Sequence, residues 1–211
     1  MSGTAAVAAV VLAAGRGTRF GQTPKLLAEL DGKPLVRHAV EAALGAGLPT
    51  LVVVGHAEPE IRAALLDLPV TILSNPAYAD GLSTSLKAGF AALPLGIEGA
   101  LILLGDMPRV RPGLLRLLVG TWESAGRPAA VVPISAGRRG NPALISRRLS
   151  ASIGKLTGDS GAGPLLRSMD GVVEIEVADQ GVLLDIDTTD ALATIGRAKT
   201  AREDGTGCIS G

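Results

Sequence analysis

Six apolar runs recur along the chain, and several are continuous rather than alternating with polar residues. A strand buried on both faces of a sheet produces a continuous run, whereas a half-exposed strand alternates. Stretches with helical spacing separate these runs, and alternation of strands with helices predicts a parallel sheet covered on both faces. The predicted strands are residues 7–13, 51–55, 70–73, 100–105, 129–134 and 172–177.

Four stretches between these runs are predicted to be helices. Residues 35–47 have helical spacing and end in glycine, which is a common helix stop. Residues 58–68 follow the same pattern. In residues 83–94, Ser83 is placed to cap the helix N-terminus. Residues 111–126 carry Pro112 near their start, where the missing amide proton does no harm.

The predicted fold class is therefore α/β, a single domain with a doubly wound, mostly parallel sheet. The 211 residues suit one large domain or two small ones, and no internal repeat or linker divides them. Hydrophobic residues make up 47% and charged residues 19%, which is enough apolar material for a sizeable core. We assign residues 1–199 to the domain and predict a disordered tail over residues 200–211.

Composition excludes several functional classes. A formal net charge of zero argues against an overall cationic nucleic-acid binder, and 2% aromatic residues offer few stacking platforms. The apolar start is shorter than the ~20 residues of a membrane span and lacks a basic flank. We expect no nucleic-acid or membrane partner. Export is the alternative interpretation of this start. Cys208 has no partner for an intrachain disulfide, which fits the cytoplasm.

A glycine-rich basic loop, LAAGRGTRFGQTPK, follows the first predicted strand. It matches neither the dinucleotide fingerprint nor the P-loop, because the glycine and lysine spacings differ. Its glycines nevertheless allow close approach of a ligand to the backbone, and loop amides can bind anions. With Arg16, Arg19 and Lys25, the loop suits a triphosphate. A solvated basic loop is the competing interpretation.

Asp106 follows the buried run 100–105 directly. A carboxylate at the carboxyl end of a parallel strand faces the crevice where such sheets bind ligands. There it could hold Mg²⁺, a hard cation that prefers oxygen ligands and substrate phosphates. An ordinary turn or helix-capping aspartate is the alternative interpretation.

The chain resembles the MobA-like nucleotidyltransferases over residues 7–197. The resemblance is carried by residues 12–27, by GDMP at 105–108 and by DIDTT at 185–189. Weaker matches are NPAYADGLSTSLKAG at 75–89, GRRGNP at 137–142 and GDSGAG at 158–163. The resemblance implies a Rossmann-like nucleotidyltransferase fold.

The resemblance also implies site residues and a Mg²⁺ cofactor. The implied catalytic residues are Lys25, Arg19 and Asp106. The implied nucleotide-binding residues are Leu12, Ala13, Ala14, Gly15, Arg16, Gly17, Lys25, Asn75, Gly81 and Ser85. The implied metal ligands are Asp106 and Asp187, and the implied acceptor-side residues are Arg139, Asn141, Pro142 and Asp159.

Several of these motifs have a structural alternative or depart from the family pattern. Asp187 lies at the exit of residues 181–187 if these form a strand, and it could instead cap the last helix. The arginines at 138 and 139 could form a plain hairpin. Gly163 stands where the family has a basic residue, and Thr189 stands where it has proline.

Among these enzymes the chain looks most like molybdenum cofactor cytidylyltransferase, the branch with LAAG. This implies CTP rather than GTP, a molybdopterin-type acceptor, pyrophosphate release and a molybdoenzyme or its chaperone as partner. The methyl group of Ala14 would narrow the space for a purine. The alternatives are a guanylyl- or sugar-phosphate nucleotidyltransferase and a non-catalytic nucleotide- or cofactor-binding chaperone. An oxidoreductase has little support, because no dinucleotide fingerprint is present.

Overall fold

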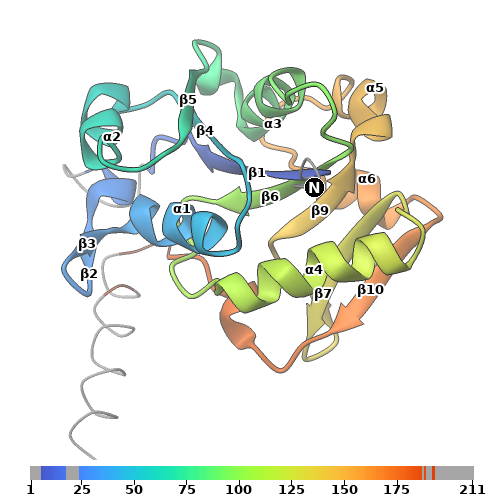
Figure 1. Cartoon of the computed structure of the whole chain (residues 1–211). Coiled ribbons are helices and arrows are strands. Elements are labelled where there is room, and N and C mark those ends of the chain that lie inside the picture. Colours follow the sequence, from blue (N-terminus) through green and yellow to red (C-terminus); the bar gives the residue numbers. More distant parts are fainter. Residues whose placement is uncertain (1–5, 18–23, 187, 189–191, 193–211) are drawn as a thin grey trace, which may run out of the picture.

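The computed structural model describes residues 6–17, 24–186, 188 and 192. An eight-stranded sheet runs through the centre of the molecule with helices on both sides (Figure 1). The six predicted strands are all present, as β1 (Val7–Ala13), β4 (Thr50–Val54), β5 (Thr71–Ser74), β6 (Gly99–Leu104), β7 (Ala130–Ser135) and β10 (Val172–Glu176). The α/β fold class and the mostly parallel sheet are thereby confirmed.

The strand order is β10-β7-β9-β6-β1-β4-β5, with β8 (Arg138–Arg139) pairing with β7. Parallel pairs join β1 to β4, β1 to β6, β4 to β5 and β10 to β7. Strand β9 (Ala143–Ser146) is antiparallel to both β6 and β7, and the sequence patterns did not predict it. Two further short strands, β2 (Glu29–Leu30) and β3 (Lys33–Pro34), form a separate antiparallel pair.

Strand β1 lies in the middle of the sheet, and this position explains why its apolar run is continuous. Every residue of β1 is buried. Its odd-numbered residues, such as Val11, pack into one core, and its even-numbered residues, such as Val10, pack into the other. Because successive side chains of a strand point to opposite faces, a strand covered on both sides needs apolar residues throughout.

The helices divide between these two cores. Helices α1 (Leu35–Gly45), α2 (Glu58–Ala64) and α4 (Pro112–Ser124) contribute to the core that contains Val11. Helices α3 (Leu82–Ala91), α5 (Ser150–Ile153) and α6 (Gly163–Arg167) contribute to the other core. In Figure 1, α1 and α4 lie together on one side of the sheet, and α3 and α5 lie on the opposite side. Short 3₁₀ helices cover Lys25–Leu27, Tyr78–Asp80, Arg147–Leu149 and Gln180–Leu183.

Two local predictions differ from the structure. Gly81, not Ser83, is the residue that precedes α3, and Ser83 is buried inside the first turn of the helix. Residues 181–186 do not form a strand, because a 3₁₀ helix ends at Leu183 and residues 184–186 are irregular. Pro112 stands at the first position of α4, as predicted. The predicted tail over residues 200–211 lies outside the described residues.

The sheet has a switch point between β1 and β6. From β1 the chain moves outward to β4 and β5, and it then returns to pair β6 on the other side of β1. Connections that leave adjacent strands in opposite directions open a crevice beyond the carboxyl ends of those strands. The glycine-rich loop follows β1, and Asp106 follows β6, so both border this crevice. Among the described residues, no helix is long and apolar enough to cross a membrane.

Candidate active site

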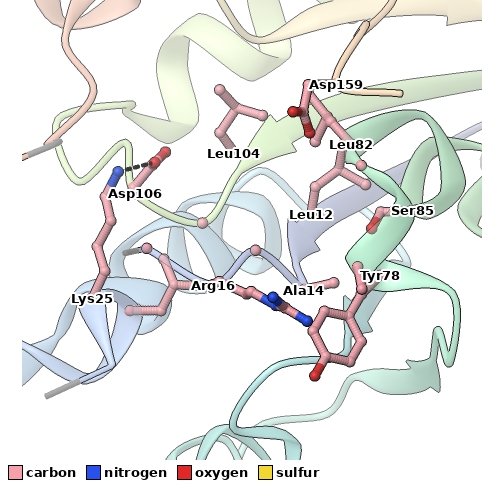
Figure 2. A pocket seen from close by; sticks show the side chains of 16 residues that line it. Leu12, Ala14, Arg16, Lys25, Tyr78, Leu82, Ser85, Leu104, Asp106 and Asp159 are labelled. Atoms are coloured by element: carbon pink, nitrogen blue, oxygen red, sulfur yellow. Dashed lines mark hydrogen bonds and ion pairs between the residues drawn. The ribbon is translucent and has the colours of Figure 1, made fainter. Parts of the chain in front are cut away.

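A cavity of about 500 Å³ opens at the switch point (Figure 2). Its walls come from the loop after β1, the start of α3, the end of β6 and a loop before α6. We call it the first cavity. It is lined by Leu12, Ala14, Gly15, Arg16, Gly17, Lys25, Leu26, Tyr78, Ala79, Gly81, Leu82, Ser85, Leu104, Gly105, Asp106 and Asp159.

The glycine-rich loop lies directly against the stem of Lys25. Gly17 has a φ of 55°, which is a left-handed conformation that favours glycine. A Cβ atom at Gly17 would stand 2.6 Å from the Cβ of Lys25. A larger residue there would push the lysine stem away from the loop. By contrast, a Cβ atom at Gly15 would meet nothing within 4 Å, so Gly15 leaves open space in the cavity wall.

Lys25 and Asp106 meet in the first cavity although 81 residues separate them in sequence. Lys25 begins the 3₁₀ helix Lys25–Leu27, and Asp106 follows β6. The Lys25 Nζ atom donates to Asp106 Oδ2 at 2.7 Å, and the two side chains are only 10% and 19% exposed. Figure 2 shows the two groups pointing toward each other. A cation from the loop and the mid-chain carboxylate therefore share one site.

The second carboxylate oxygen of Asp106 fits a bound cation. Oδ1 is buried and has no hydrogen-bond partner among the described residues. Burial raises the pKa of the Asp106 carboxyl above its ordinary value, while Lys25 opposes this shift and the charge of Asp185 adds to it. A buried, unpaired carboxylate oxygen is costly, and a hard divalent cation is a ligand that would satisfy it. The donor chemistry therefore fits a metal ion.

The segment that carries the late aspartates runs beside Asp106. The backbone amide of Ile186 donates to the Asp106 carbonyl at 3.1 Å. Asp187, the predicted second metal ligand, lies outside the described residues. Within the described part of the chain, no group of three or more acidic, histidine or cysteine side chains could hold a metal.

Arg16 and Tyr78 form another wall of the first cavity. The Arg16 guanidinium lies over the Tyr78 ring, 5.6 Å from its centre, an arrangement that attracts the cation to the face of the ring. Tyr78 itself packs against Gly55 at the end of β4, where a Cβ atom would stand 2.6 Å from Tyr78 Cβ. The Tyr78 ring thus lies against Arg16 of the glycine-rich loop (Figure 2).

Gly81 allows the loop with Asp159 to close over the start of α3. It has a φ of 109°, and a Cβ atom there would stand 2.3 Å from the carbonyl carbon of Gly158. The Ser83 amide donates to the Gly158 carbonyl at 3.1 Å, which holds the two segments together. Asp159 is consequently brought to the edge of the first cavity.

Asn75 is buried and has a structural task. Its side-chain amide donates to the hydroxyls of Thr84 and Ser85 at 2.9 and 3.0 Å, and its Oδ1 accepts from the Ala77 amide at 3.1 Å. These bonds tie the turn after β5 to α3. Asn75 therefore orients Ser85, which lines the first cavity, but does not line it itself.

The predicted site residues separate into three groups. Of the predicted nucleotide-binding residues, Leu12, Ala14, Gly15, Arg16, Gly17, Lys25, Gly81 and Ser85 line the first cavity. Ala13 does not, because it points into the opposite core from its neighbours, and Asn75 does not, because the turn uses its side chain. Arg19 and Asp187 lie outside the described residues.

The predicted acceptor-side residues do not all lie together. Arg139 and Asn141 line a second cavity of about 250 Å³, whereas Asp159 lines the first cavity. Pro142, which follows a cis peptide bond, lines neither. The loop with Asp159 docks on Gly81, and residues 161–163 of the same loop line the second cavity. The acceptor-side role of these four residues stays a prediction.

Sequence reasoning missed several residues of these walls, including Tyr78 and Arg167. Tyr78 is the one tyrosine in a chain with 2% aromatic residues, and this rarity was the available signal. Arg167 lines the second cavity from the end of α6. No motif marks it, since its position depends on how a short helix packs.

The sequence of the chain is similar to that of known nucleotidyltransferase-family proteins. The family model for the MobA-like NTP transferase domain matches residues 9–172. Nicotine blue oxidoreductase of Paenarthrobacter nicotinovorans is 31% identical over 197 residues, which cover 88% of this chain and 94% of that protein. The bifunctional protein GlmU of Kineococcus radiotolerans is 36% identical over 129 residues, but these cover 59% of this chain and only 26% of GlmU.

Solved structures agree on the fold. Rv0371c of Mycobacterium tuberculosis H37Rv superposes with a TM-score of 0.80 at 27% identity, covering 90% of this chain and 97% of that one. A second structure of Rv0371c, in complex with manganese, gives a TM-score of 0.78 at the same identity, covering 91% and 98%.

Proposed function

The chain belongs to the MobA-like NTP transferase domain family, and from this premise we propose that it transfers CMP from CTP to the phosphate of a molybdopterin-type cofactor. The family supports nucleotidyltransferase activity in general. The observation that carries the proposal is the convergence of a glycine-rich cationic loop, Lys25 and a partly unpaired Asp106 in one cavity.

In the proposed reaction, an oxygen of the acceptor phosphate attacks the α-phosphorus of CTP. A new P–O bond forms, the bond from the α-phosphorus to the bridging oxygen breaks, and pyrophosphate leaves with that electron pair. No covalent enzyme intermediate is required. Positioning and neutralisation of charge then supply most of the rate enhancement.

Each charged group of the first cavity has a role in this proposal. Lys25 contacts the α-phosphate and stabilises the charge that develops there. Arg19 and Arg16 bind the β- and γ-phosphates, with the amides of Gly15 and Gly17 beside them. Asp106 and Asp187 would hold a divalent metal, which would supply positive charge against the phosphates. The manganese complex of Rv0371c supports a divalent metal, and we propose Mg²⁺ here.

CTP is the proposed nucleotide because of the size of the residue at position 14 in the wall of the first cavity. Ala14 lines it, and its methyl group takes up space near the glycine-rich loop. A pyrimidine needs less room than a purine. The proposed acceptor enters from the side of the second cavity, which shares Leu12, Leu82 and Leu104 with the first.

The test is pyrophosphate release with CTP, GTP, UTP and ATP. Each nucleotide is assayed with and without Mg²⁺, and with and without the molybdopterin-type acceptor. We expect release with CTP only when both metal and acceptor are present. Preferential pyrophosphate release with GTP would contradict the choice of CTP and would identify a guanylyltransferase. Nucleotide-dependent stabilisation without any pyrophosphate would favour a non-catalytic binding protein.

Two relatives favour other candidates. A sugar-phosphate nucleotidyltransferase is one alternative, and the similarity to GlmU, which covers about a quarter of GlmU, supports nucleotidyl transfer in general. Pyrophosphate release with UTP and a sugar 1-phosphate would identify that activity. The similarity to nicotine blue oxidoreductase extends along most of both chains and favours an oxidoreductase. Redox turnover of nicotine blue, without pyrophosphate release, would identify that one.

A further inference from the structure

The second cavity is apolar over most of its wall. It lies between the sheet and the helices of the α3 side, and we keep the name second cavity for it. Its lining residues are Leu12, Leu82, Leu86, Ile102, Leu104, Val132, Arg139, Gly140, Asn141, Ala143, Ile145, Gly161, Ala162, Gly163, Leu166 and Arg167. A mostly apolar cavity with a few polar groups is the usual form of a small-molecule site.

Two charged residues line the second cavity, Arg139 and Arg167, and they differ in what they contact. The Arg139 guanidinium is paired with Glu174 and also donates to the Leu166 carbonyl at 3.0 Å. Its charge is therefore neutralised within the protein. Arg167 makes no hydrogen bond or ion pair with any described residue, so its charge is available to a ligand.

The Arg167 side chain folds back over the start of its own helix. Its Nη1 atom lies 3.5 Å from the point where a Cβ atom on Gly163 would stand. Gly163 and Arg167 are four residues apart, so they lie on the same face of α6. The 3.5 Å distance is an ordinary van der Waals contact, so the guanidinium occupies the space beside Gly163 at the cavity wall.

Asn141 supplies a second polar group, a side-chain amide with no partner among the described residues. Its backbone amide donates to the Val182 carbonyl at 2.8 Å, but its side-chain amide makes no hydrogen bond to the described part of the chain. Asn141 and Arg167 thus present a neutral amide and a cation to the same apolar cavity.

We propose that Arg167 binds the negative charge of the acceptor phosphate, and that the second cavity takes a flat, ring-sized body of the acceptor against its apolar wall. The identification of the occupant as the acceptor rests on the proposed function. Arg167 is a specificity residue in this arrangement: the apolar wall selects the body, Asn141 accepts or donates one hydrogen bond to it, and Arg167 selects the charge.

The experiment is a fluorescence titration with 1-naphthyl phosphate and 1-naphthol as probes. We expect 1-naphthyl phosphate to bind the wild-type protein and Arg167→Ala to weaken it about tenfold or more, as for loss of a charged hydrogen bond. Binding of 1-naphthol should be unchanged in this variant. Arg138→Ala removes a neighbouring exposed arginine that lines neither cavity, and it should change nothing.

Two further variants locate the probe. Adding Gly163→Arg to Arg167→Ala returns a cation to the same wall and should restore binding of 1-naphthyl phosphate. Ala143→Phe fills the apolar cavity and should remove binding of both aromatic probes. Equal binding to wild type and Arg167→Ala, or undiminished binding to a folded Ala143→Phe variant, overturns the proposal.

Thermal shifts with CTP and Mg²⁺ in the same variants separate this proposal from the proposed function. Stabilisation by nucleotide without Arg167-dependent probe binding defeats the inference about Arg167 alone. Arg167-dependent probe binding without stabilisation by any nucleotide supports the cavity and defeats the proposed function.

Discussion

At the scale of single residues, Lys25 and Asp106 determine whether the first cavity can act on phosphates. One Asp106 oxygen holds Lys25, and the other is buried without a described partner. A carboxylate so placed can hold a metal while its neighbour contacts a phosphate. The two residues are therefore expected to contribute to catalysis rather than to folding.

We expect Lys25→Ala and Asp106→Asn each to reduce pyrophosphate release about a hundredfold or more, because each removes one electrostatic contact of the transition state. Steady-state pyrophosphate assays measure this, with circular dichroism as the check of folding. Lys33→Ala is the matched control, since Lys33 pairs with Glu41 on an exposed surface. Near-normal turnover of either site variant would contradict the assigned roles.

Gly81 is a residue whose replacement should disturb both stability and the site. Gly81→Ala must place a Cβ atom 2.3 Å from the Gly158 backbone, in addition to the strain of a φ of 109°. Gly96→Ala is the matched control, because Gly96 also has a positive φ of 86° but nothing within 4 Å.

Urea unfolding should show a loss of about 1–2 kcal/mol for Gly96→Ala, from backbone strain alone, and a clearly larger loss for Gly81→Ala. Nucleotide affinity should fall only in Gly81→Ala, since the displaced loop carries Asp159 of the first cavity. Equal losses of stability in the two variants would show that the contact with Gly158 is unimportant.

At the scale of elements, the packing of α3 on β1 depends on a glycine. A Cβ atom at Gly89 would stand 2.5 Å from Val10 Cγ1, in the middle of the sheet. Gly120 is the matched glycine in α4, where a Cβ atom would meet nothing within 4 Å. The same substitution is therefore expected to have opposite effects in the two helices.

Gly89→Ala should lower the free energy of unfolding by about 1–3 kcal/mol, as overpacking does in a close-packed core. Gly120→Ala should raise it by about 0.5–1 kcal/mol, because alanine restricts the unfolded chain and favours the helix. Urea denaturation measures both. A stabilising Gly89→Ala would mean that α3 moves away from β1 without cost.

At the scale of the whole molecule, an ion pair joins α1 to the loop after α2. The Arg37 guanidinium makes two hydrogen bonds to Asp67, at 2.7 and 2.9 Å, and one to the Ala64 carbonyl at 2.8 Å. The bonds from Arg37 lower the pKa of Asp67 from 3.8 to about 2. The Arg37–Asp67 ion pair therefore makes the stability of the folded state depend on pH.

Because the folded pKa is the lower one, the contribution is complete above about pH 4 and disappears as the pH falls toward 2. Asp67→Asn should therefore melt below the wild type at pH 7, and the difference should shrink between pH 4 and 2. Thermal melts across this range measure it. Asp170→Asn changes an exposed carboxyl with no ion pair among the described residues, and its difference from wild type should not follow this course. A constant difference for Asp67→Asn would contradict the assignment.

Local pattern was enough to predict the six main strands, four helices and the α/β class. Continuous apolar runs reveal strands buried on both faces, and helical spacing reveals the elements between them. Strand β9 was missed because its apolar run is only three residues long, from Ala143 to Ile145. Residues 181–186 have strand-like composition but no partner strand, and they form the end of a 3₁₀ helix followed by an irregular segment.

By itself the sequence determined the composition of the candidate site: a glycine-rich cationic loop after one strand and an aspartate after another. Only the tertiary structure decided which of these groups meet. Lys25 reaches Asp106 because β1 and β6 are adjacent in the sheet, and Asp159 reaches the first cavity because its loop docks on Gly81. Local propensity acts over a few residues, whereas these contacts depend on the order of strands and on the packing of loops across the whole fold.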